Sequence, residues 1–165
     1  MTVRLGMALK ELHEAESALA AEFRTVGERH AAEHDIHHIC ATLAEQCHAH
    51  AERLRPAAAR YDEQLPEQEP PASGEGLLPG LRRSGSRLTG RQPPTGVLLL
   101  HDLRRLYLMA EECEIDWAMV EQGAKAARDR ELLETATACM EQTAVQVKWL
   151  KTRIKEAAPQ TLTVG

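Results

Sequence analysis

Glu16 is the one charged side chain in an otherwise apolar helical stripe near the start of the chain. Apolar residues recur there at intervals of three and four, the spacing that gathers side chains on one face of a helix. The apolar members of this stripe are Leu5, Leu9, Leu12, Leu19, Phe23 and Val26. A carboxylate in such a position costs free energy unless a cation, a shared proton or a metal compensates it. The chemistry available to the chain therefore depends on which residues of other helices face Glu16.

Three residues on two other helical stripes have side chains that could face Glu16. Cys47 and His50 lie on the second stripe, and Glu114 lies at the edge of the third, roughly 40° from Ala110. One interpretation is a buried ion pair of Glu16 with His50, with Glu114 leaning toward solvent. The other is a metal site, since two carboxylates and an imidazole can hold one divalent ion (iron, manganese or zinc). Cys47 would complete a set of ligands suited to zinc.

The apolar spacing predicts an all-α protein with four helices, at about residues 2–30, 34–60, 96–126 and 130–157. The stripes of the last three helices are Ile36, Cys40, Leu43, Cys47, His50 and Leu54; Leu99, Leu103, Leu106, Ala110, Cys113, Trp117 and Val120; and Leu133, Ala136, Met140, Thr143, Val147, Leu150 and Ile154. Thr95 and Asp129 are suited to cap the third and fourth helices. Pro56 is expected to kink or end the second helix, and the fourth is expected to end before Pro159.

Residues 61–95 break this pattern because they are rich in proline and glycine. We expect a long connection that is solvated and in part disordered. The alternative is that residues 77–81 dock on the bundle, or that the nearby arginines bind an acidic partner. Short connections make antiparallel hairpins of the first helix with the second and of the third with the fourth. The sequence therefore predicts a single domain over 1–165, an antiparallel four-helix bundle with a long crossover between the second and third helices.

This order of elements resembles the ferritin-like superfamily. The stretches 11–16 (ELHEAE), 50–54 (HAERL) and 111–116 (EECEID) are most similar to small bacterial stress-induced ferritin-like proteins. The resemblance implies inward-facing Glu, Glu-x-x-His, Glu and Glu-x-x-His on successive helices, which hold two iron or manganese ions. Glu16, His50 and Glu114 match this pattern. Cys47 stands where the family has the Glu of the second helix. On the fourth helix of this chain, Val147 and Leu150 stand where the family has its Glu and His.

The resemblance therefore implies a degenerate metal site. Glu45 and His48 have the family's spacing on the second helix, but Glu45 points outward and His48 to the side when measured against the stripe. Oxidase chemistry with two metals would require both to face inward. We expect Cys40, Cys47, Cys113 and Cys139 to be small buried residues in a reducing compartment. The histidines near the start of the second helix (His30, His34, His37 and His38) are expected to be solvated; the alternative is that His34 and His38, one turn apart, chelate a metal at the surface.

Composition excludes several classes of function. The net charge of -5 and the absence of a long basic run argue against nucleic-acid binding. No apolar run is long enough for a membrane span, so a cytoplasmic protein is expected. We expect a non-enzymatic bundle that acts as a homo-oligomer or through a protein partner. The alternative is a metal-binding, stress-related protein of the ferritin-like type.

Overall fold

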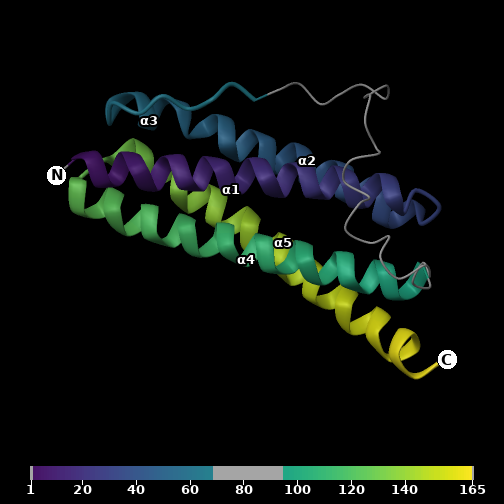
Figure 1. Ribbon diagram of the computed structural model, residues 1–165. Helices are drawn as coiled ribbons and strands as arrows, with labels where there is room; N and C mark the ends of the chain where they lie inside the picture. Colours follow the sequence, from purple (N-terminus) through teal and green to yellow (C-terminus); the bar gives the residue numbers. More distant parts are fainter. Residues whose placement is uncertain (1, 69–94, 165) are drawn as a thin grey trace.

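The computed structural model describes residues 2–68 and 95–164, which form four long helices and one short helix and contain no strand (Figure 1). The helices are α1 (Thr2–Arg29), α2 (His34–Arg53), α3 (Arg55–Arg60), α4 (Thr95–Ala127) and α5 (Arg130–Thr163). The predicted all-α class is confirmed. None of these helices has the length and apolar character needed to cross a membrane, as far as the described residues go.

Two antiparallel helix pairs make up the structure, α1 with α2 and α4 with α5, and α1 also packs against α4 (Figure 1). Arg60 and Tyr61, at the end of α3, both donate hydrogen bonds to the Asp129 carboxylate in the α4–α5 turn. An added Cβ at Gly6 would lie 2.7 Å from Glu63, so glycine lets the segment after α3 lie against α1. The chain thus leaves α3 beside the C-terminal end of α4, whereas Thr95 begins α4 at the opposite end of the molecule.

A polar layer divides the core into two apolar clusters. One cluster contains Leu19, Phe23 and Val26 of α1 with partners from α2, α4 and α5. The other contains Leu9 and Leu12 of α1 with partners from α3, α4 and α5. Glu16 lies on α1 between Leu12 of one cluster and Leu19 of the other. The position that interrupts the sequence pattern therefore also interrupts the packed core.

The predicted stripes agree with the structure on the first three long helices and differ on the fourth. On α4 the buried residues include Leu103, Leu106, Ala110, Cys113, Trp117 and Val120, as expected. On α5 the predicted Ala136, Thr143 and Leu150 are buried, but the other predicted members are only half-buried, and Leu132, Cys139 and Gln146 are buried in their place. The apolar pattern of α5 fits either of two adjacent rows, because Leu132 and Leu133 are neighbours. Packing against α4 selects the row that contains Gln146.

The prolines affect the helices in different ways. The predicted second helix is interrupted at Leu54, and Pro56 falls in the first turn of α3, where its missing N–H costs no helical hydrogen bond. The prediction that the last helix ends before Pro159 is wrong, since α5 continues through Pro159 to Thr163. Pro159 lies close to the C-terminal end of α5, so its missing N–H costs one hydrogen bond near the end of the helix. The predicted cap Thr95 is itself the first residue of α4, and most of the predicted crossover, residues 69–94, lies outside the described residues.

Candidate functional site

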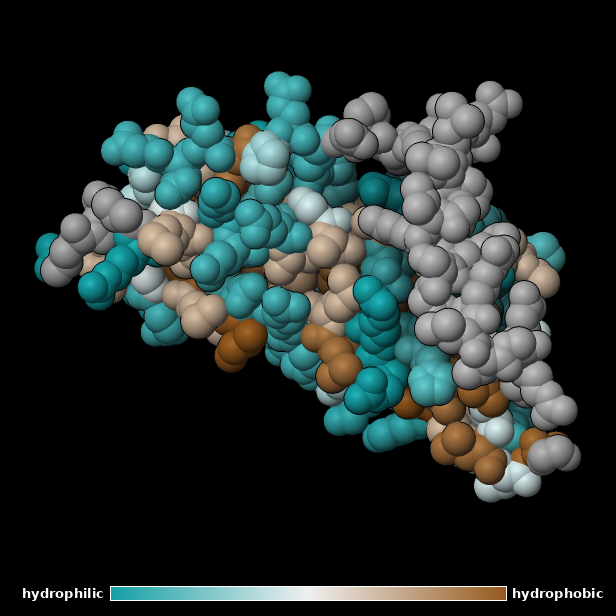
Figure 2. Space-filling view, in the orientation of Figure 1, coloured by the Kyte–Doolittle hydropathy of each residue, from teal (hydrophilic) through white to brown (hydrophobic). Residues whose placement is uncertain are grey.

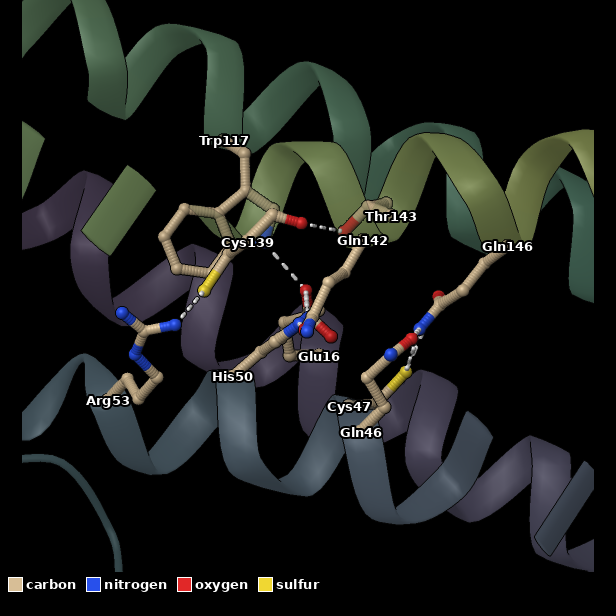
Figure 3. A network of polar contacts seen from close by, with 10 residues as sticks. All are labelled: Glu16, Gln46, Cys47, His50, Arg53, Trp117, Cys139, Gln142, Thr143 and Gln146. Carbon is tan, nitrogen blue, oxygen red and sulfur yellow. Dashed lines mark hydrogen bonds and ion pairs between the residues drawn. The ribbon is translucent and has the colours of Figure 1, made fainter. Parts of the chain in front are cut away.

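The Glu16 carboxylate is fully buried and accepts hydrogen bonds from two other helices (Figure 3). Trp117 Nε1 of α4 donates to Glu16 Oε1 at 2.6 Å. His50 Nδ1 of α2 contacts the same oxygen at 3.2 Å. The second carboxylate oxygen, Oε2, is buried without a hydrogen-bond partner among the described residues. Glu16 therefore joins α1 to α2 and α4 through one of its two oxygens.

His50 extends this network to α5. Its Nε2 lies 2.6 Å from Gln142 Oε1, and its Nδ1 faces the Glu16 carboxylate (Figure 3). When both neighbours are acceptor oxygens, both ring nitrogens donate, and the ring is an imidazolium. The geometry then describes an ion pair of His50 with Glu16. Turning the Gln142 amide would instead present a donor to Nε2 and fit the neutral ring.

A second set of polar contacts joins α2 to α5 on either side of His50 (Figure 3). Gln146 Nε2 donates to Gln46 Oε1 at 2.6 Å, and the Cys47 thiol donates to Gln146 Oε1 at 3.7 Å. Arg53 Nη1 lies 3.7 Å from Cys139 Sγ. Side-chain hydrogen bonds therefore bridge α2 and α5, whose backbones approach each other much less than those of α4 and α5.

The structure brings together three of the four residues that the sequence analysis singled out. Glu16 and His50 are in contact, and Cys47 lies near enough for the Glu16 charge to add to burial in raising the pKa of its thiol. Glu114 is half-buried elsewhere on α4, and burial followed by the nearby Glu111 raises the pKa of its carboxyl. Within residues 2–68 and 95–164, no three His, Cys, Asp or Glu side chains converge as metal ligands do. Metal binding at these positions stays a prediction.

Glu45 is exposed and His48 is half-buried on α2, as their positions relative to the apolar stripe predicted. Sequence reasoning missed the three neutral partners Trp117, Gln142 and Gln146. The α4 stripe counts Trp117 as an apolar residue, although a buried indole needs an acceptor for its N–H. That need is a usable signal, since the Glu16 carboxylate has four lone-pair positions and one histidine cannot fill them all.

The expectation that the histidines near the α1–α2 turn are solvated is wrong for His30. His30 is buried, and its Nε2 lies 2.7 Å from Asp102 Oδ2 of α4, which also pairs with Arg29. Asp102 is adjacent to the stripe residue Leu103, so the same turn of α4 supplies a carboxylate to the end of α1. His34 and His38 are exposed as expected, whereas His37 is half-buried.

His13 is a further buried histidine that the sequence analysis did not single out. Neither of its ring nitrogens has a hydrogen-bond partner among the described residues. Burial, and then the nearby Arg55 charge, lower its pKa, while Glu52 and Glu14 oppose this effect. We conclude that His13 is neutral in the folded protein near pH 7.

All four cysteines are buried and free, which confirms their predicted role as small core residues. Burial raises the pKa of Cys40 and of Cys139 to about 12 in each case. Thiols of this kind are protonated at neutral pH and are poor nucleophiles and poor metal ligands.

Comparisons of the chain with protein-family models, with characterised proteins and with solved structures found no match.

Proposed function

We propose that the chain is a non-enzymatic helical bundle of ferritin-like architecture with a degenerate metal site, and that it acts through self-association. The observation that carries this proposal is the internal pairing at the polar layer. His50 uses both ring nitrogens, and Glu16 uses one oxygen, on partners within the chain. Side chains that satisfy one another in this way fix the register of four helices instead of presenting ligands to a substrate.

The ferritin-like architecture is supported by the order and direction of the helices. α1 with α2 and α4 with α5 are antiparallel pairs, and α3 ends beside Asp129 at the far end of α4 from Thr95. The end of α3 and the start of α4 thus lie at opposite ends of the bundle, the placement that a ferritin-like order of helices requires. Four free, buried cysteines favour a reducing compartment such as the cytoplasm.

Metal binding is the second candidate, and one atom favours it. Glu16 Oε2 is buried without a partner among the described residues, and a cation is one of the few groups that would compensate it there. His50 could contribute a nitrogen if Gln142 released it. Cys47 could contribute only as a thiolate, which burial and the Glu16 charge oppose by raising its pKa.

Protein purified without an affinity tag separates the two candidates. Self-association predicts a sedimentation coefficient that rises with protein concentration, together with less than about a tenth of an equivalent of bound metal. A monomer at every concentration would overturn the first candidate. Near-stoichiometric metal that is lost in both the Glu16→Ala and the His50→Ala variant would establish the second.

A further inference from the structure

The outward face of α4 carries three large apolar side chains that the bundle leaves uncovered. Leu108, Ile115 and Met119 are 50%, 60% and 54% exposed. Their spacing of seven and four residues keeps them within about 20° of one line along the helix. Figure 2 shows apolar side chains interrupting the polar surface along the edge of the molecule where α4 runs. A stripe of this kind on a long helix is typical of a helix–helix contact.

The charged side chains on this face change sign at Leu108: those before it along the helix are basic, and those after it are acidic. Arg104 and Glu112 lie four residues before and four residues after it, and both are exposed. Among the described residues, neither has an ion-pair partner of its own. Arg105 and Glu111 lie three residues before and after Leu108 and repeat the same opposition, but both have partners within the chain, since Arg105 pairs with Glu22 and Glu111 accepts a hydrogen bond from Tyr107. One half of the face is therefore basic and the other half acidic.

This arrangement is complementary to itself when two copies lie antiparallel. A two-fold axis through Leu108 places Leu108 against its equivalent, Arg104 against Glu112 of the other copy, and His101 against Ile115. The same axis places Met119 against the half-buried Val97. A parallel pair would instead set arginine against arginine and glutamate against glutamate.

We propose that two copies of this chain associate through the outward faces of α4, antiparallel, about a two-fold axis at Leu108. This inference rests on the proposed self-association and names the surface responsible for it. The occupant is a second copy because a charge pattern that reverses about one residue matches its own two-fold image. A different partner would have no reason to show that symmetry.

Paired charge reversals test the register directly. The Arg104→Glu variant sets the new carboxylate against Glu112 of the other copy, and the Glu112→Arg variant sets arginine against arginine. Because each repulsion occurs twice in the dimer, we expect either substitution to raise the dissociation constant at least about tenfold at low salt. In an equimolar mixture of the two variants, the mixed dimer sets glutamate against arginine at both contacts. The double variant R104E/E112R does the same within a dimer of identical chains. The double variant should therefore recover the association that each single reversal loses.

Two controls carry equivalent changes away from this face. Lys148→Glu reverses an exposed charge on α5, and Val145→Glu replaces an apolar side chain that is 66% exposed there. Leu108→Glu, by contrast, opposes two carboxylates on the axis. We expect association to be lost in Leu108→Glu and retained in both controls. Far-UV circular dichroism should be the same for all variants, since every substituted side chain is exposed.

The measurement is sedimentation equilibrium on the full chain from about 1 μM to about 0.2 mM, a range that covers weak dimers. Recovery of association in the double variant supports the antiparallel pairing. If the wild type associates but the double variant stays dissociated, or if the single reversals have no effect, this interface is wrong while self-association stands. If the wild type is monomeric throughout, the interface and the proposed function both fail.

Discussion

The hydrogen bond from Trp117 to Glu16 gives the sharpest prediction about the polar layer. Trp117→Phe removes the Nε1–H that lies 2.6 Å from Glu16 Oε1 and leaves the fully buried carboxylate with only His50, at 3.2 Å. A hydrogen bond to a charged group contributes about 1.5–3 kcal/mol. The smaller ring also loses packing, which adds about 1 kcal/mol. We expect the free energy of unfolding to fall by about 3 kcal/mol in total.

The second tryptophan provides a matched control. Trp149 packs against the other core cluster, is half-buried, and makes no side-chain hydrogen bond with the described residues. Trp149→Phe therefore removes the same atoms without removing a hydrogen bond, and should cost only about 1 kcal/mol. Urea unfolding followed by far-UV circular dichroism, at one fixed protein concentration, measures both variants. If Trp117→Phe is no more destabilising than Trp149→Phe, the hydrogen bond to Glu16 contributes nothing and our interpretation of the polar layer is wrong.

Three further predictions concern His13, the thiols and Asp129. His13 has a lowered pKa in the folded state, so below its usual value of 6.5 the unfolded chain binds a proton that the folded chain does not. Stability should therefore fall as the pH falls there, by up to about 1.4 kcal/mol per pH unit; His13→Leu should remove this slope in pH-dependent urea unfolding, and the exposed control His34→Leu should keep it. The four buried cysteines should react with a thiol reagent only slowly at pH about 8, and all of them quickly after unfolding in urea; rapid reaction of any thiol in the native protein would contradict their burial. Asp129 accepts from Leu132 N at the start of α5 and holds Arg60 and Tyr61, so Asp129→Ala should lower the free energy of unfolding by about 1–2 kcal/mol; the exposed Glu134→Ala on the same helix should change it little, and equal losses would count against the cap.

The positions of α1, α2 and α4 were predictable because each carries one unambiguous apolar row. The interruption of the first row at Glu16 also identified the polar layer, and His50 was correctly predicted to face it. The row on α5 was only partly predictable: Ala136, Thr143 and Leu150 are buried as expected, but Leu132 and Leu133 allow two phases and the choice depends on packing. Gln146 was missed for the same reason, and His30 was missed because Asp102, its partner, lies far away in the sequence. Long-range polar pairs leave no periodic signal in a single chain.

The most direct test of our central claim is a double-mutant cycle on Glu16 and His50, which we describe as an internal structural pair. Glu16→Leu and His50→Leu should each be costly alone, because each leaves a buried polar partner unsatisfied. The double variant should cost about 1–3 kcal/mol less than the two single losses combined. This coupling should be the same in EDTA and with added divalent metal. Losses that simply add, or a coupling that appears only when metal is present, would contradict the account.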